Sequence, residues 1–473
     1  MKTSFFKKLN YVVVTVSMIL ALGVTASAQQ SLVNFSHIEH LSERIYLNGD
    51  SVNIIRIYAD YPSYNWVDAK ESGPEGIACV DDAARIAVAY LRHYELTKSN
   101  SSKTKAKEFL KFVLKLQAVD GQFYNFIYAD HSINRDGKTS FKSFGWWAAR
   151  GVWSYGLGYR IFEKEDPQFA AILRAGIEKT FIHLDTLLHH YGKKREISGY
   201  TIPQWLLYES GSDATTELVL GLTEYYKATT DKKVKSYIEK LCDGIMLMQN
   251  GDVWNYPFGL HRSWETMWHA WGNGQTQALA EAGKVLKNKK MIASAQREAD
   301  GFYSRLLIQG FKREFDVADS SKKREFEQIA YDIRPITVGL IRLYEATNEK
   351  KYLTMAKLAG SWFFGNNAVN VQMYDPVTGR CFDGIHSYTE FNKNSGAEST
   401  IEALYTIIEL EQYDKTGEFT KYKRVRNGET EKFLFGLFSH GSGDIGLVLD
   451  KERGKVSVLQ GKVLSEFVKK NVK

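Results

Sequence analysis

The sequence predicts an all-α fold in which helical hairpins close into a ring. Three observations support this prediction. The chain of 473 residues contains only seven prolines, apolar residues recur at helical spacing in eleven segments, and most of these segments come in pairs separated by short polar gaps. Similar polar helix starts also return at a nearly constant interval, which is typical of a repeated architecture.

The first 28 residues predict export of the protein. Lys2, Lys7 and Lys8 precede an apolar run at 11–24, and the stretch ends in Ala-Ser-Ala at 26–28. This order is typical of a secretory signal peptide with its cleavage site. We therefore expect a mature protein in the periplasm or outside the cell, with no membrane span.

Charge and cysteine content exclude several classes of protein. The formal net charge is +7, and it falls to +4 once the three signal-peptide lysines are removed. Lysine and glutamate are mixed along the chain, so nothing favours nucleic-acid binding. The chain has only three cysteines, an odd and sparse count that argues against a disulfide framework.

The helical segments define the expected domains. An N-terminal extension at 29–75 holds a probable strand at 52–58, the helical ring occupies 76–414, and a small β appendage follows at 415–473. The predicted helices are 78–97, 102–118, 144–163, 166–191, 213–228, 232–249, 265–286, 288–308, 325–346, 349–364 and 396–414.

Six polar helix starts recur at separations of 54 to 67 residues. In a closed ring of αα-hairpins, the first helices form the inner layer and all begin at one end. That end would therefore collect the polar starts into a single site. The starts are marked by Asp82, Trp147, Asp213, Met267, Tyr331 and Glu398.

Aromatic residues gather near the same helix starts. Trp146 and Trp147 lie at the start of one predicted inner helix, 144–163, and Trp264 and Trp268 lie at the start of another, 265–286, with Trp271 at helical spacing from them. Sugar rings stack on indoles, so an aromatic cleft with polar groups favours a carbohydrate ligand. The alternative is that Trp264, Trp268 and Trp271 pack in the core.

Six hairpins with acids at the inner-helix starts resemble the six-hairpin glycosidase superfamily of (α/α)6 barrels, over residues 70–414. Val80-Asp81-Asp82 on the first inner helix and Asn394 to Thr400 on the last, preceded by WFFGNN at 362–367, are similar in layout to glycoside hydrolase family nine. The resemblance implies that acids near the first helix activate water and that a late glutamate protonates the leaving oxygen. The GIACVDDAAR and NSGAEST stretches, with WFFGNN and YDP between them, also resemble an uncharacterised (α/α)6 module found next to bacterial glycosyltransferases.

Asp81, Asp82 and Glu398 are the candidate catalytic residues. Adjacent acids on a helix point about 100° apart, so one can cap the helix while the other faces the interior, and we favour Asp82 for the second role. Asp81 could also pair with Arg85 one turn later. The alternative for Glu398 is a capping box with Ser395, which matches the S-x-x-E pattern.

Other polar residues near the helix starts are candidate sugar contacts. These are Tyr124 and Asn125 in a loop, His269, Arg334 and Asn394. Asp213 fits the N-cap position of its helix. His261 and His269 would lie about 12 Å apart on one helix, too far to share a metal ion, so we expect no metal and no cofactor.

The first functional hypothesis is a secreted glycoside hydrolase that acts as a monomer on an oligo- or polysaccharide with paired carboxylates. The second is a polysaccharide lyase or another non-hydrolytic (α/α)6 enzyme, for which His131, Tyr331 and Arg334 would supply the base and the charge neutralisation. The third is a catalytically silent glycan-binding protein of the envelope that uses the same cleft.

Overall fold

The computed structural model describes residues 31–472, which form one compact unit. The predicted signal peptide at 1–28 lies outside these residues. Within the described part, no helix is both long and apolar enough to cross a membrane.

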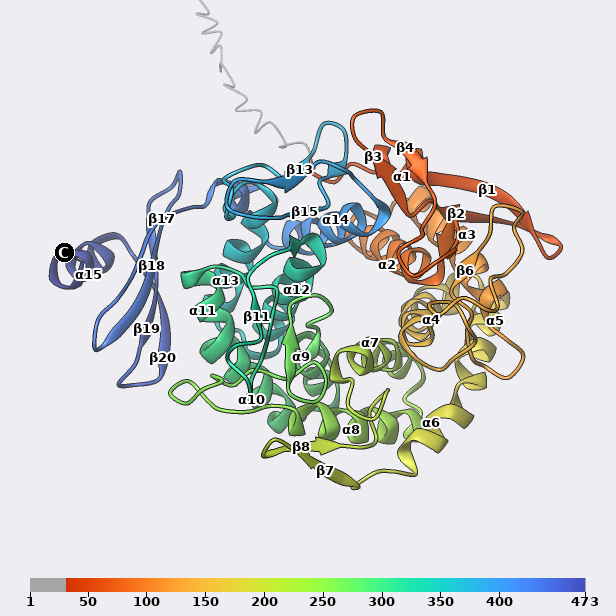
Figure 1. Cartoon of the computed structure of the whole chain (residues 1–473), viewed down its shortest axis with the longest axis horizontal. Helices are drawn as coiled ribbons and strands as arrows, with labels where there is room; N and C mark the ends of the chain where they lie inside the picture. Colours follow the sequence, from red (N-terminus) through yellow and green to blue (C-terminus); the bar gives the residue numbers. More distant parts are fainter. Residues whose placement is uncertain (1–30, 473) are drawn as a thin grey trace, which may run out of the picture. The chain divides into compact units, whose positions relative to one another are not determined.

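Six helices form the inner wall of a ring, an (α/α)6 barrel, within the described chain (Figure 1). Each contacts the next, and the last contacts the first, which closes the ring. The inner helices are buried along most of their length; α7, for example, is buried from Ser212 to Tyr225. They are α2 (Val80–Thr97), α4 (Trp146–Glu165), α7 (Ser212–Thr229), α9 (Gln275–Leu286), α12 (Ala330–Thr347) and α14 (Ala397–Glu411).

Outer helices follow five of these inner helices along the chain. The short helix α1 (Ser36–Leu41) lies against the sixth, α14. The outer helices are α3 (Asn100–Leu116), α5 (Pro167–Lys179) with α6 (Phe181–Leu188), α8 (Lys232–Leu247), α10 (Lys289–Glu298) with the π-helix η1 (Ala299–Tyr303) and α11 (Ser304–Gln309), and α13 (Lys350–Gly360) with the 3-10 turn η2 (Ser361–Phe363).

The hairpin turns share one backbone device. Inner helices end at Lys98, Thr230, Lys287 and Asn348, each in the left-handed conformation with φ between 53° and 60°. Such a residue ends a helix because its N–H bonds back to the last turn. In the first, third and fourth hairpins, a Ser, Asp or Asn side chain then caps the outer helix. This explains why the polar gaps marked the hairpins in the sequence.

The helix predicted at 265–286 is shorter than expected. Residues Met267–His269 form strand β9, which pairs with β10 (Glu314–Asp316), and α9 starts only at Gln275. Gly272 has φ +69°, which interrupts a helix, and the preceding aromatic residues favour extended structure. The helical spacing assumed for the tryptophans in this segment was therefore wrong.

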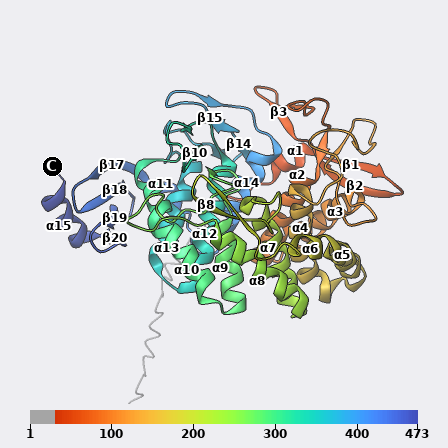
Figure 2. The same ribbon diagram turned by 60° about the horizontal axis from the view of Figure 1, so that its bottom comes forward.

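Short strands occupy the connections at the N-terminal end of the inner helices (Figure 2). The strand expected at 52–58 is split between two elements, β2 and β3. The hairpins and small sheets are formed by β1 (Ser42–Leu47) with β2 (Asp50–Ile55), β3 (Tyr58–Asp60) with β4 (Asn65–Val67), β5 (Ala78–Cys79) with β6 (Phe126–Ile127), β7 (Lys194–Ile197) with β8 (Tyr200–Pro203), β10 with β9 and β11 (Lys323–Arg324), β13 (Tyr374–Asp375) with β14 (Arg380–Cys381), and β15 (Gly384–Ile385) with β12 (Gln328–Ile329) and β16 (Phe391–Asn392).

A four-stranded antiparallel sheet follows the ring, preceded by the 3-10 turn η3 (Glu418–Lys421). Its strands β17 (Lys423–Glu429), β18 (Phe433–Ser439), β19 (Ile445–Asp450) and β20 (Lys455–Gln460) pair in chain order. The sheet packs against α11 and α13, and helix α15 (Gly461–Asn471) follows β20. The sequence indicated only the two apolar middle strands, because β17 is largely polar and β20 mixes polar and apolar residues.

Charged side chains fill the bore of the ring in two layers about two helical turns apart. Seven residues, or about 10 Å of helix, separate Arg85 from Arg92, Glu217 from Glu224, and Glu402 from Glu409. We call the first the pocket layer and the second the base layer. The pocket layer comprises Asp81, Asp82, Arg85, Arg150, Glu217, Arg334, Glu398 and Glu402; the base layer comprises Arg92, Glu95, Arg160, Glu224, Lys227, Glu281, Lys284, Arg342, Glu345 and Glu409.

Candidate active site

A pocket of about 840 Å³ lies over the N-terminal ends of α2, α4, α12 and α14. Convergence of inner-helix starts on one site was the central expectation from the sequence. Its aromatic lining residues are Tyr58, Phe126, Trp146, Trp147, Trp271 and Tyr331, and its acidic lining residues are Asp60, Glu71, Glu75, Asp81, Asp82, Glu327, Asp383 and Glu398.

Asp81 is the more exposed member of the acid pair on α2. Its side chain retains 28% of its accessible surface, and the Nε of Arg150 lies 3.3 Å from its carboxylate. The backbone N–H groups of Val80 and Asp81 bond instead to the side-chain oxygen of Asn125. Because the Asn125 side chain accepts these hydrogen bonds at the start of the helix, the Asp81 carboxylate is not needed as a cap and remains available to the pocket.

Asp82 is almost completely buried, although it touches the pocket. Its carboxylate accepts hydrogen bonds from Arg85 at 2.8 Å and from the thiol of Cys79 at 3.3 Å. Burial raises the pKa of Asp82 to about 6, against the opposing effect of Arg85. The sequence favoured Asp82 as the residue that faces the interior; in the structure Asp81 is the one with the accessible carboxylate.

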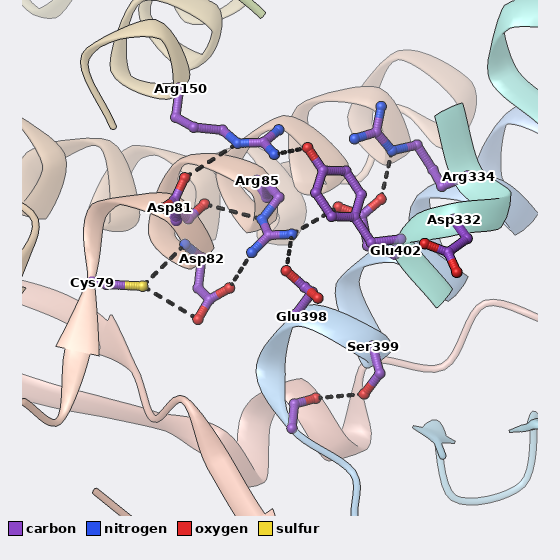
Figure 3. Close-up of polar contacts among 12 residues, drawn as sticks. Cys79, Asp81, Asp82, Arg85, Arg150, Asp332, Arg334, Glu398, Ser399 and Glu402 are labelled. Carbon is purple, nitrogen blue, oxygen red and sulfur yellow. Dashed lines mark hydrogen bonds and ion pairs between the residues drawn. The ribbon is translucent and has the colours of Figure 1, made fainter. Parts of the chain in front are cut away.

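Arg85 links the first inner helix to the last (Figure 3). Its Nη2 atom pairs with Asp82, and its Nη1 atom pairs with Glu398 at 2.9 Å and with Glu402 at 3.1 Å. Arg85 contacts only the backbone oxygen of Asp81, so the expected pairing with that carboxylate is replaced by the one with Asp82. One guanidinium therefore holds three carboxylates at the wall of the pocket.

Glu398 points into the pocket from the start of α14. Its side chain is 43% exposed, and its carboxylate pairs with Arg85 at 2.9 Å. The alternative of a capping box with Ser395 does not hold, because Gly396 is the N-cap residue and no side chain caps α14. Ser395 instead accepts a hydrogen bond from the backbone of Cys381.

Arg150 and Arg334 extend the charged network beneath the pocket. Arg150 pairs with Glu217 at 2.9 Å and donates to the hydroxyl of Tyr331. Arg334, fully buried, pairs with Glu402 at 2.5 Å. Of these residues, Arg150 and Tyr331 line the pocket, whereas Arg334 lies behind its wall.

The predicted aromatic residues divide into two groups. Trp146 and Trp147 line the pocket, and Trp271 faces Trp146 with ring centroids 5.8 Å apart. Trp264 and His269 pack behind Trp271, with the His269 ring stacked on it at 3.8 Å. Trp268 is completely buried against Phe302 and Phe315, as in the core alternative.

His269 and Asp213 form a buried pair. The Nε2 atom of His269 lies 2.8 Å from the Asp213 carboxylate, and neither residue lines the pocket. The expected N-cap position of the helix is taken by Gly211, not by Asp213. His261 is also buried, 2.8 Å from the carboxylate of Glu298.

The predicted loop residues have different surroundings. Asn394 lines the pocket and accepts a hydrogen bond from the backbone of Tyr61. The hydroxyl of Tyr124 accepts from Arg135, and Tyr124 is not among the lining residues. His131, partly exposed in a tight turn with φ +67°, is not among them either.

Several residues that line the pocket were not predicted from the sequence. Asp60, Glu71 and Glu75 come from the N-terminal extension, which the sequence placed outside the ring. Glu327 and His386 form a pair at 3.2 Å on another wall. Apart from Asp60, which ends the three-residue strand β3, these residues belong to irregular connections, for which neither periodicity nor spacing gives a signal.

Two further acids belong to this region: Asp383 lines the pocket, and Asp332 is buried behind its wall. Asp383 accepts hydrogen bonds from the Ser399 hydroxyl at 2.6 Å and from the Gly396 backbone at 2.8 Å, and burial raises its pKa to about 6. Burial raises the pKa of Asp332 to about 8, although Arg313 lies 3.5 Å away. Within residues 31–472, no group of three or more His, Cys, Asp or Glu side chains is arranged to hold a metal ion.

The family model described as glycosyl hydrolase family 9 matches residues 154–423, which is more than half of the chain. The chain belongs to this family. We therefore class it as a carbohydrate-processing enzyme. The match includes Glu398 and Glu402 but begins within α4, so the acid pair on α2 lies outside it.

Solved structures of sugar-converting enzymes share the fold of this glycosyl hydrolase family 9 member. A sugar epimerase from a ruminal bacterium superposes with a TM-score of 0.55 and 14% identity, over 76% of this chain and 92% of that one. Cellobiose 2-epimerase from Bacillus thermoamylovorans superposes with a TM-score of 0.54 and 13% identity, over the same shares of the two chains. D-mannose isomerase superposes with a TM-score of 0.51 and 14% identity, over 76% of this chain and 91% of that one. At these identities the likeness establishes the (α/α)6 fold alone. A comparison with curated proteins gives no match.

Proposed function

We propose that the protein is an exported glycoside hydrolase in which Asp81 and Glu398 are the catalytic carboxylates. One observation carries the proposal. Among the five carboxylates of the pocket layer, Asp81 and Glu398 have the accessible side chains, at 28% and 43%, whereas Asp82, Glu217 and Glu402 are buried at 1–3%. Within this layer of the described chain, the accessible pair is therefore the one that can contact a sugar and a water molecule.

The two carboxylates are assigned different roles. Asp81 acts as the base that removes a proton from water, because its carboxylate is accessible in the pocket and lies beside Arg150. Glu398 acts as the acid that protonates the departing glycosidic oxygen. These assignments follow the order implied by the resemblance to family nine.

Arg85 provides the means for Glu398 to change partners. A general acid must carry a proton, whereas an ion pair with Arg85 requires the carboxylate form. When a sugar draws Glu398 away, Arg85 still retains Asp82 at 2.8 Å and Glu402 at 3.1 Å. The buried guanidinium is therefore never left uncompensated, which would be costly.

The lyase alternative has less support. Proton abstraction beside a uronic carboxylate needs a cation that is free to neutralise the substrate charge. Each arginine that lines the pocket already pairs with an acid: Arg85 with three, Arg150 with Asp81 and Glu217, and Arg313 with Asp332. His131 and Arg334, two of the three residues named for this alternative, are not among the lining residues.

The test is release of reducing ends from a panel of oligo- and polysaccharides. Asp81→Asn and Glu398→Gln are each expected to lower kcat by about a hundredfold to ten-thousandfold, the range for loss of a general acid or base. Asp68→Asn and Glu390→Gln serve as matched controls, because both side chains are exposed and neither lines the pocket.

Hydrolysis that survives both active-site substitutions would remove these residues from the mechanism. Absorbance from unsaturated uronides would indicate a lyase instead. Binding of a glycan without any turnover would support the silent envelope protein.

A further inference from the structure

The lining of the pocket carries an excess of negative charge. Within the described chain, eight carboxylates line it, against three arginines and His386. The arginines do not offset this excess, because they also pair with Glu217, Glu402 and Asp332 behind the wall. A ligand in the pocket therefore meets a field that favours positive charge.

The N-terminal extension supplies the acids with the fewest protein partners. Asp60, at the end of β3, is exposed, and its carboxylate has no hydrogen bond or ion pair among residues 31–472. Glu71 is exposed as well and accepts only the hydroxyl of Tyr58, at 2.8 Å. Glu75, in contrast, is buried and holds Thr139 and the backbone of Glu71.

Aromatic rings lie in the same pocket as these acids. Tyr58, Trp146 and Trp271 line it, and indole and phenol faces are the surfaces on which sugar rings stack. The combination of ring-stacking surfaces with carboxylates that have no cationic partner within residues 31–472 differs from a metal site, which needs several ligands around one point. It fits a sugar that carries its own cation.

We propose that the substrate is a glycan with free, positively charged amino groups, and that Asp60 and Glu71 select it. This inference rests on the proposed function, since it names the substrate class of the same pocket. An ammonium group has three hydrogen-bond donors and a full positive charge. A carboxylate accepts its hydrogen bonds and attracts its charge. N-acetylation removes the charge and would remove the preference.

Titration calorimetry at pH 6 with three tetrasaccharides tests the inference. They are the β-1,4-linked tetramers of glucosamine, N-acetylglucosamine and glucose, bound to Glu398→Gln protein so that turnover does not interfere. The amino tetramer is expected to bind about tenfold more tightly than the other two, with a preference that shrinks at high salt.

Two variants locate the preference. Asp60→Asn and Glu71→Gln, each made in the Glu398→Gln background, are expected to weaken binding of the amino tetramer by several-fold while leaving the acetylated one unchanged. Asp68→Asn, also exposed but not a lining residue, should alter neither. Equal affinity for the three sugars, no binding of the amino tetramer, or equal loss for charged and neutral sugars would overturn the inference.

Failure of the proposed substrate class can be distinguished from failure of the proposed hydrolase function. Cleavage of neutral glycans that depends on Asp81 and Glu398, without any preference for amines, would refute only the substrate class. A charge preference that depends on Asp60, in a protein whose activity ignores Asp81 and Glu398, would refute only the catalytic assignment.

Discussion

The base layer and the pocket layer of the bore are both built from acidic and basic side chains of the inner helices, six helices for the base layer and five for the pocket layer, yet their charges balance differently. In the described chain, the base layer contains five carboxylates and five cations, whereas the pocket layer contains five carboxylates and three arginines. The pocket layer therefore has two acids in excess.

The location of the excess is informative. In the base layer, Glu224 meets Arg92 at 2.7 Å, Lys227 at 2.8 Å and Arg160, and it is buried. In the pocket layer, the accessible acids are Asp81 and Glu398. A balanced buried layer supports the ring, and an unbalanced layer at the open end leaves carboxylates for chemistry. Three substitutions test this distinction through stability.

Removing a charge from the centre of the base layer should have the largest effect on stability. Glu224→Gln leaves Arg92, Arg160 and Lys227 undercompensated, and loss of one buried ionic partner costs about 3 kcal/mol or more. Chemical denaturation should show this loss in the free energy of unfolding. Glu178→Gln, in an exposed pair on α5, should change it by less than about 0.5 kcal/mol. A loss as small as in this control would show that the base layer does not support the ring.

The buried acid Asp82 on α2 should make stability depend on pH. Because the pKa of Asp82 is about 6 in the folded protein and lower when unfolded, ionisation of Asp82 opposes folding. Its stabilising contribution is complete below about pH 4 and is lost as the pH rises through 6. Asp82→Asn should therefore reduce the loss of stability between pH 4 and 7 by roughly 1–3 kcal/mol. If the free energy of unfolding of Asp82→Asn changes between pH 4 and 7 as much as that of the wild type, the result would contradict the burial of Asp82.

The edge of the base layer should tolerate change. Lys227 is 31% exposed and is one of three cations around Glu224. Lys227→Met is expected to cost only about 0.5 kcal/mol, because a partly solvated pair contributes little. A loss as large as that of Glu224→Gln would show that the layer has no spare cation and would weaken the contrast between its centre and its edge.

The sequence predicted the architecture well because its signals are local. Helical periodicity, polar hairpin gaps and recurring helix starts depend on neighbours along the chain, and they placed Asp81, Asp82, Trp147 and Glu398 at one end of a ring. Both acids line the pocket, but which of them keeps an accessible carboxylate was not readable, because that depends on distant partners such as Arg150, 69 residues from Asp81. The Arg85 cluster likewise depends on contacts between the first and last inner helices.

Irregular segments were harder to predict from the sequence than the helices. Trp264 and Trp268 matched a helical spacing, but Trp268 lies in β9, which pairs with β10, and Trp264 lies across a turn from Met267. Asp60 and Glu71 gave no signal, since loop acids are ordinary on any protein surface. Long-range packing decides whether such residues are solvated or line a site.

The most direct test of the account measures kcat/KM and the free energy of unfolding together for Glu398→Gln, on whichever glycan the panel identifies. We predict a loss of at least about a hundredfold in kcat/KM, with stability changed by less than about 1 kcal/mol, because the side chain is 43% exposed. Full activity, or a loss of activity explained by unfolding, would contradict the claim that the unbalanced layer supplies the chemistry.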